Sequence, residues 1–227
     1  MIPLKDENPT ATFPLFTILF IVINISLFAY QLSLGPTNIE PFVKRMAVVP
    51  GEILHGFAPR EYATLLTSLF LHGGLLHLLG NMLYLWIFGN NIEDALGHLP
   101  FVLFYVLCGI AASLTHILLN ATSDIPVIGA SGAISGVLGA YLILYPRARV
   151  LAAIPIFFFI RIVRVPASFF LIIWIAFQVL QGLPSLGGDA AQAGSVAWFA
   201  HIGGFLAGIL LLPLFLGRRQ VARLRDI

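Results

Sequence analysis

The sequence alternates between long stretches without a charged residue and short segments that collect the charges. A helix needs roughly 20 apolar residues to cross a hydrocarbon core about 30 Å thick. Six stretches approach or exceed this length, which predicts an all-α polytopic membrane protein with six transmembrane helices in one bundle. These stretches are residues 13–30, 62–92, 95–123, 125–146, 165–188 and 190–217.

Two connections between these stretches are predicted to lie at the membrane interface. Residues 33–63 mix apolar and charged side chains and contain four prolines, which favours a structured interfacial loop over a loose linker. Residues 150–160 are apolar but short and framed by arginines, so we expect an interfacial segment rather than a seventh span. The predicted organisation is a cytoplasmic segment 1–12, a membrane domain 13–217 and a basic cytoplasmic tail 218–227.

Composition supports a membrane location and the charges predict an orientation. Hydrophobic residues make up 59% of the chain and charged residues 10%, against about 25% charged in soluble proteins. With a cytoplasmic N-terminus, nine of the twelve Lys and Arg residues fall inside, as the positive-inside rule favours. Both termini are therefore predicted to be cytoplasmic, in a bacterial inner membrane. The net charge of +2 gives no indication of nucleic-acid binding.

Three groups of polar residues lie inside the predicted spans. His72, His77 and Asn81 come early in the second stretch, Ser131 begins the fourth span, and His201 lies in the first turns of the sixth. Polar groups inside a bilayer are costly and often functional. Even-numbered spans run in one direction, so we expect these residues to share one depth near the outer face.

These residue types predict a hydrolytic site. Ser131 needs a base to become a nucleophile, and His201 is the candidate base. His77 and Asn81 lie one helical turn apart and could donate hydrogen bonds to an oxyanion. No acidic residue is placed to act as a third triad member, since Asp124 and Asp189 fall in the outer loops and are expected to be solvated. The prediction is therefore a Ser–His dyad rather than a triad.

Small residues explain how the fourth and sixth spans could bring the dyad together. Each span carries a face of small side chains at four-residue spacing, which lets helix backbones approach closely. These residues are Gly132, Gly136 and Ala140 on one span, and Ala200, Gly204 and Gly208 on the other. Residues 131–145 would form a helix only about 22 Å long, so we expect Ser131 to lie below the outer surface, beside a water-filled cavity.

The other histidines are interpreted without catalytic roles. His116 is expected to pack near the outer end of the third span, and His72 to brace the second. His55 and His98 lie in connections and are expected to be solvated.

The motifs carrying these residues resemble those of the rhomboid family. They are Gly129-Ala130-Ser131-Gly132, Ala200-His201-Ile202-Gly203-Gly204, and His77-Leu78-Leu79-Gly80-Asn81 preceded by His72. The resemblance covers residues 13–217. It implies an intramembrane serine endopeptidase that cleaves transmembrane proteins and has membrane lipid as its surroundings, without a cofactor or metal.

Residue by residue, the resemblance implies specific roles. Ser131 would be the nucleophile and His201 the general base, with His77 and Asn81 as oxyanion donors and Gly129 shaping the nucleophile loop. Glu93 looks like part of a structural motif. Some members carry an aromatic residue four positions after the serine, to stack on the histidine, but here that residue is Ser135.

Two alternatives use the same residues. An inactive rhomboid-like protein would bind membrane clients without cutting them, although such a protein usually lacks the serine or the histidine. A small transporter or channel would line a polar pathway through the full bilayer depth. The sequence instead confines these polar groups to the outer half, and it carries no signal that sets an oligomeric state.

Overall fold

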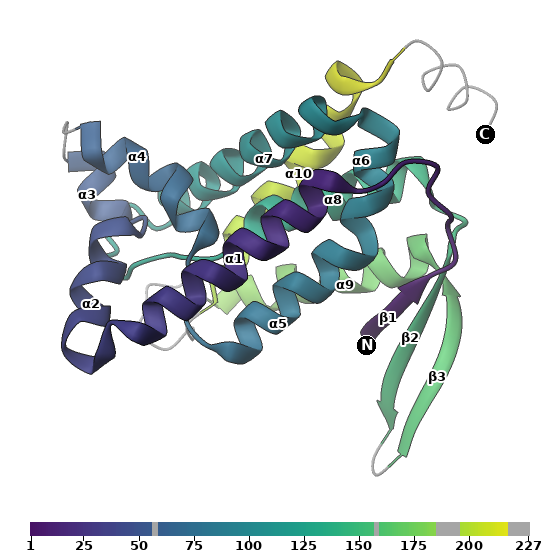
Figure 1. Cartoon of the computed structure of the whole chain (residues 1–227), viewed down its shortest axis with the longest axis horizontal. Helices are drawn as coiled ribbons and strands as arrows, with labels where there is room; N and C mark the ends of the chain where they lie inside the picture. Colours follow the sequence, from purple (N-terminus) through teal and green to yellow (C-terminus); the bar gives the residue numbers. More distant parts are fainter. Residues whose placement is uncertain (56–58, 157–158, 185–195, 218–227) are drawn as a thin grey trace.

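The computed structural model describes residues 1–55, 59–156, 159–184 and 196–217, and these are largely helical (Figure 1). The predicted stretches contain α1, α5, α7, α8, α9 and α10, and α5 continues through a π-helical turn into α6. Their bounds are α1 Leu15–Ser33, α5 Leu75–Tyr84, the π-helical turn Leu85–Gly89, α6 Asn90–Leu96, α7 His98–Leu119, α8 Ser131–Leu144, α9 Ala167–Gly182 and α10 Trp198–Phe215.

Helix length and apolar surface fit a protein that crosses a membrane several times. Helices α1, α7 and α10 are each long and apolar enough to span a bilayer. The helices on either side of residues 71–74 would form a fourth span, bent by 79°. Helices α8 and α9 are apolar but have only 14 and 16 residues. An integral multi-pass membrane protein is therefore confirmed, whereas the count of six spans stays a prediction.

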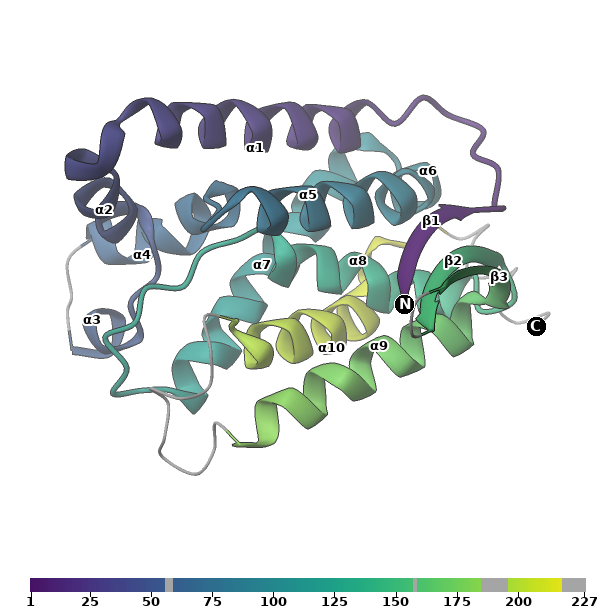
Figure 2. The ribbon, with the colours of Figure 1, turned by 90° about the horizontal axis from the view of Figure 1, so that it is seen from below.

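Helix α8 lies at the centre of the bundle. In Figure 2, α1 and α9 lie on opposite sides of α7, α8 and α10, and all ten residues from Gly132 to Tyr141 are buried. A methyl group at Gly204 would collide with the carbonyl oxygen of Gly132, and one at Gly208 with that of Gly136. The predicted close approach of the two glycine-bearing helices is therefore confirmed.

The long first loop is structured, as predicted. It contains α2 (Gly35–Met46), α3 (Pro50–His55) and α4 (Pro59–Thr67), which gather at one end of the bundle (Figure 1). Val48 and Val127 form an antiparallel bridge, with hydrogen bonds of 3.1 and 2.7 Å between their backbones. The loop thus holds the irregular segment that leads into α8.

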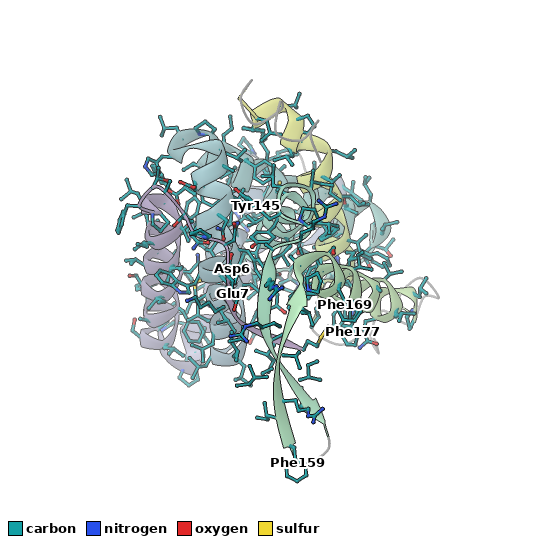
Figure 3. The ribbon with its side chains drawn as sticks, turned by 90° about the vertical axis from the view of Figure 1, so that its right-hand side faces the viewer. Asp6, Glu7, Tyr145, Phe159, Phe169 and Phe177 are labelled. Carbon is teal, nitrogen blue, oxygen red and sulfur yellow. The ribbon has the colours of Figure 1, made fainter. Side chains whose placement is uncertain are left out.

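A small β-sheet corrects the all-α prediction. Strands β1 (Ile2–Asp6), β2 (Arg149–Ile156) and β3 (Phe159–Pro166) form an antiparallel sheet in the order β1-β2-β3. The segment predicted as a simple interfacial stretch is thus part of a hairpin, which projects beyond the helices with Phe159 at its far end (Figure 3). The β-branched side chains of β3 favour a strand, and β1 completes the sheet from more than 140 residues away.

Glu93 joins the start of α1 to the junction between α6 and α7. Its side chain is fully buried and accepts hydrogen bonds from the backbone N–H groups of Phe16 (2.9 Å) and Thr17 (2.8 Å). His98 Nδ1 lies 2.6 Å from the same carboxylate. The structural role predicted for Glu93 fits these contacts. The expectation that His98 is merely solvated was wrong, because its ring pairs with a buried acid.

Candidate active site

A cavity of about 910 Å³ lies where the ends of α5, α7, α8 and α10 meet. Ser131, His201, His77, Asn81 and Gly129 all line it. These residues come from three helices and one connecting segment, and the sequence predicted that they converge at one depth. The structure therefore brings all five candidate site residues together around one space.

Ser131 is the first residue of α8, and the backbone turns sharply at Gly129 just before it. Gly129 has φ +132°, a conformation that residues with a side chain rarely adopt. Its N–H donates to the carbonyl oxygen of Ser68 at 2.9 Å. A Cβ at Gly129 would lie 2.9 Å from the His77 ring. Glycine is therefore required here both for backbone conformation and for space beside His77.

The hydroxyl of Ser131 faces the imidazole of His201. Ser131 Oγ lies 2.8 Å from His201 Nε2, although the residues are 70 positions apart. His201 is in the first turn of α10, and the glycine contacts between α8 and α10 allow these two turns to lie side by side. The predicted contact is therefore observed, and the catalytic roles of both residues stay predictions.

His77 and Asn81 lie one turn apart on α5 and line the same cavity as Ser131. The backbone N–H of Gly73 donates to His77 Nδ1 at 3.4 Å, so Nδ1 accepts and the ring proton of the neutral histidine is assigned to Nε2. A Cβ added at Gly129 would be 2.9 Å from that Nε2 and 3.5 Å from Ser131 Oγ. His77 can therefore present an N–H group next to Ser131.

Asn81 is held by His72, which has the bracing role that the sequence predicted. Asn81 Nδ2 lies 3.0 Å from His72 Nε2, and both side chains are buried. The backbone of His72 makes two hydrogen bonds with the side-chain amide of Gln31, each 3.1 Å long. A helix outside the site, α1, thus fixes the position of a residue that lines the cavity.

The aromatic rings that pack beside His201 do not come from the position that the rhomboid resemblance implies. Ser135 is fully buried and its hydroxyl donates to the carbonyl oxygen of Ser131 at 2.6 Å. The rings beside His201 come from Trp174 on α9, with centroids 6.0 Å apart and planes at 35°, and from Trp198, at 6.1 Å and 90°. Aromatic side chains from α9 and α10 therefore flank the histidine instead of a ring from α8.

Sequence reasoning missed Gln178, which lies in the C-terminal half of apolar helix α9. Its Oε1 lies 2.8 Å from His201 Nδ1, and the side chain is 5% exposed. The signal was available, because an amide side chain inside an apolar span is costly unless it has a partner. It was overlooked because Gln178 belongs to no motif shared with Ser131 or His201.

The remaining candidate polar groups play lesser parts. His116 lines the cavity, and its Nδ1 is buried without a hydrogen-bond partner among the described residues. Asp124 is exposed, as expected of a solvated loop residue, whereas Asp189 and the side chain of His55 lie outside the described part. In that described part, no three His, Cys, Asp or Glu residues are placed to hold a metal ion.

Comparison with known sequences identifies the family. The rhomboid domain matches residues 59–218, which include every candidate site residue. The chain belongs to the rhomboid family. The resemblance predicted from the three motifs is therefore confirmed.

Several curated relatives of this rhomboid carry protease or rhomboid names. It is 39% identical to Rhomboid protease GluP of Bacillus subtilis (strain 168) over 130 residues, 57% of this chain and 24% of that protein. It is 33% identical to Rhomboid protein 1, mitochondrial, of Saccharomyces cerevisiae, over 66% of this chain and 42% of that protein. The corresponding values for RHOMBOID-like protein 1 of Arabidopsis thaliana are 32%, 82% and 42%. This rhomboid thus spans less than half the length of these relatives.

Proposed function

We propose that this rhomboid is an intramembrane serine endopeptidase that hydrolyses transmembrane proteins in or near the outer half of the bilayer. The 2.8 Å contact between Ser131 Oγ and His201 Nε2 inside a cavity carries the proposal. A hydroxyl beside an imidazole is the arrangement that activates a serine nucleophile. The protease name of a relative that is 39% identical supports the same reaction class.

The reaction proceeds in two stages. His201 Nε2 accepts the Ser131 proton as Oγ attacks the scissile carbonyl carbon, and the resulting imidazolium then protonates the leaving amine. An acyl group remains on Oγ. Water, deprotonated by the same imidazole, attacks the ester and releases the new carboxylate, which restores the Ser131 hydroxyl.

Three kinds of donor face the developing oxyanion. The Nε2–H of His77 and the amide of Asn81 come from α5, and backbone N–H groups come from the first turn of α8, where a helix has no acceptor of its own for them. The positive end of the α8 dipole adds to their effect. Donors that are already in position stabilise the transition state without reorganising during the reaction.

The positive-inside prediction places this site toward the outer face, with both termini in the cytoplasm of a bacterial cell. The substrate is a membrane-spanning protein whose cleavable segment reaches the cavity from the lipid or from the outer surface. The proposed hydrolysis uses no cofactor. A transport pathway is disfavoured, because α8 and α10 are packed backbone against backbone at Gly136 and Gly208, near the middle of each helix.

Serine-directed labelling tests the proposal. Purified detergent-solubilised protein is treated with a fluorophosphonate and, in parallel, with a model transmembrane substrate. Ser131→Ala abolishes both labelling and cleavage, and His201→Ala lowers both by at least about 1,000-fold because the nucleophile loses its base.

Ser113→Ala is the matched control, since Ser113 is another buried serine that lines the cavity, and it retains labelling. Equal labelling and cleavage in wild type, Ser131→Ala and His201→Ala would contradict the proposal. Membrane-client binding without cleavage by the wild type would instead identify an inactive relative.

A further inference from the structure

Gln178 is a buried amide side chain in the largely apolar helix α9. Helix α9 runs from Ala167 to Gly182, and Gln178 is buried while its neighbours Phe177 and Val179 are exposed. Taking an amide out of water without hydrogen-bond partners is costly. Gln178 has two partners, and their chemistry determines which way its amide points.

The backbone carbonyl of Trp174 fixes the orientation of the Gln178 amide. Gln178 Nε2 donates to this oxygen at 3.1 Å. A carbonyl oxygen can only accept a hydrogen bond, so the reversed amide would place two acceptors against each other. The correct orientation therefore has Nε2 toward Trp174 and Oε1 toward His201.

The orientation of the Gln178 amide then determines which ring nitrogen of His201 carries the hydrogen. Oε1 lies 2.8 Å from His201 Nδ1 and can only accept, so Nδ1 must carry the hydrogen. A neutral imidazole has one ring hydrogen, which leaves Nε2 as an acceptor. That nitrogen lies 2.8 Å from Ser131 Oγ, so the tautomer set by Gln178 is the one able to accept the serine proton.

We propose that Gln178 is a positioning residue that holds His201 in its Nδ1–H tautomer and aims Nε2 at Ser131. This inference rests on the proposed function of the Ser131–His201 pair. In a catalytic triad a carboxylate orients the histidine; here an uncharged amide does so, which avoids burying a negative charge in the bilayer. The Trp174 carbonyl prevents the amide from reversing and stabilising the unproductive tautomer.

The tautomer of His201 in the wild-type protein is the first test. In protein labelled with ¹⁵N-histidine, the ring ¹⁵N chemical shifts distinguish a protonated from an unprotonated nitrogen, and His201→Ala identifies the signals of this residue. We expect protonated Nδ1 and unprotonated Nε2 in the resting protein near neutral pH. An Nε2–H tautomer would overturn the proposal whether or not the protein is active.

Two substitutions connect the tautomer to the reaction. Gln178→Leu removes the acceptor and should lower kcat by about 10- to 100-fold, the effect of misaligning a reacting group, while KM changes less than about twofold. It should also increase the Nε2–H population of His201. Gln178→Glu in its protonated form can donate to the Trp174 carbonyl and accept from Nδ1, so it should recover kcat to within about threefold of wild type.

The matched control is Gln181→Leu, which makes the same replacement at an exposed position of α9 and should leave kcat unchanged. Wild-type kcat in Gln178→Leu, with an unchanged His201 tautomer, would overturn the proposal. So would equal loss of activity in the leucine and glutamate variants with the native tautomer kept in both. An inactive wild type that still shows the Nδ1–H tautomer would contradict the proposed protease function instead.

Discussion

At the residue scale, the side-chain amide of Asn81 has two N–H hydrogens that point to different places. One Nδ2 hydrogen is directed to His72 Nε2, 3.0 Å away, and the other is free to face the cavity that Asn81 lines. His72 is itself anchored to Gln31 of α1. The donor proposed for the oxyanion is therefore already oriented before substrate arrives, which is the condition for effective electrostatic stabilisation.

Replacing Asn81 with alanine tests this role. Asn81→Ala should lower kcat by about 10- to 1,000-fold, because the transition state loses one hydrogen-bond donor. KM should change little, and the protein should lose about 1–3 kcal/mol of stability, because His72 Nε2 is left without its partner. The measurement is cleavage of a transmembrane reporter over a range of substrate concentrations.

Asn38→Ala is the control, since Asn38 is exposed on α2 and donates to the carbonyl oxygen of Leu34, the residue before this helix. An Asn81→Ala variant that turns over as fast as wild type would remove Asn81 from the proposed oxyanion site.

At the element scale, the reactive pair depends on the contact between α8 and α10. Gly204 and Gly208 face the carbonyl oxygens of Gly132 and Gly136 so closely that no side chain fits between them. Ser131 precedes Gly132 and His201 precedes Gly204 by less than one turn. The separation of the two helix axes therefore controls the distance between hydroxyl and imidazole.

Widening this contact should damage stability and activity together. Gly204→Ala forces the helices apart and should destabilise the protein by about 1–3 kcal/mol, as overpacking does in other cores. It should also reduce kcat, because Ser131 and His201 move apart. Thermal unfolding in detergent and reporter cleavage measure the two effects.

Gly80→Ala is the matched control for stability. Gly80 is in α5, and a Cβ there would meet nothing within 4 Å, so alanine should leave the unfolding temperature unchanged or raise it. If Gly204→Ala unfolds at the wild-type temperature with full activity, the close contact is not what positions the pair.

At the scale of the whole molecule, the N-terminus and the reactive residues lie at opposite ends. Ser131 begins α8, while Tyr141 near its other end donates a hydrogen bond to Asp6 of β1 at 2.8 Å. Burial raises the pKa of the Asp6 carboxyl, and the Tyr141 hydrogen bond opposes that rise. If the N-terminal strand is cytoplasmic, the cavity must open toward the other side of the membrane.

Cysteine labelling in intact bacterial cells measures this orientation. Thr37→Cys, on exposed helix α2, should react with a membrane-impermeant maleimide from outside, whereas Lys5→Cys should react only after the membrane is opened. The wild-type protein serves as the blank, because its single cysteine, Cys108, is fully buried. The reverse pattern of labelling would invert the predicted topology and place the site on the cytoplasmic side.

Much of this rhomboid is determined by local sequence. Apolar stretches locate the membrane helices, because bilayer thickness sets a minimum length for each. The positions of Ser131, His201, His77 and Asn81 near the starts of alternate stretches put them in one layer. The four-residue spacing of small side chains indicates the faces that pack, since that spacing matches the helical repeat.

Only the tertiary structure decided the contacts between segments that are far apart in the chain. Strand β1 pairs with β2 because the fold brings residue 150 close to the N-terminal segment. No hydrophobic pattern within residues 2–6 indicates this pairing. Gln178 reaches His201, 23 positions further along the chain, because α9 packs beside α10. Sequence patterns report what each segment can bury, whereas hydrogen bonds between segments depend on where the folded backbone places each donor and acceptor.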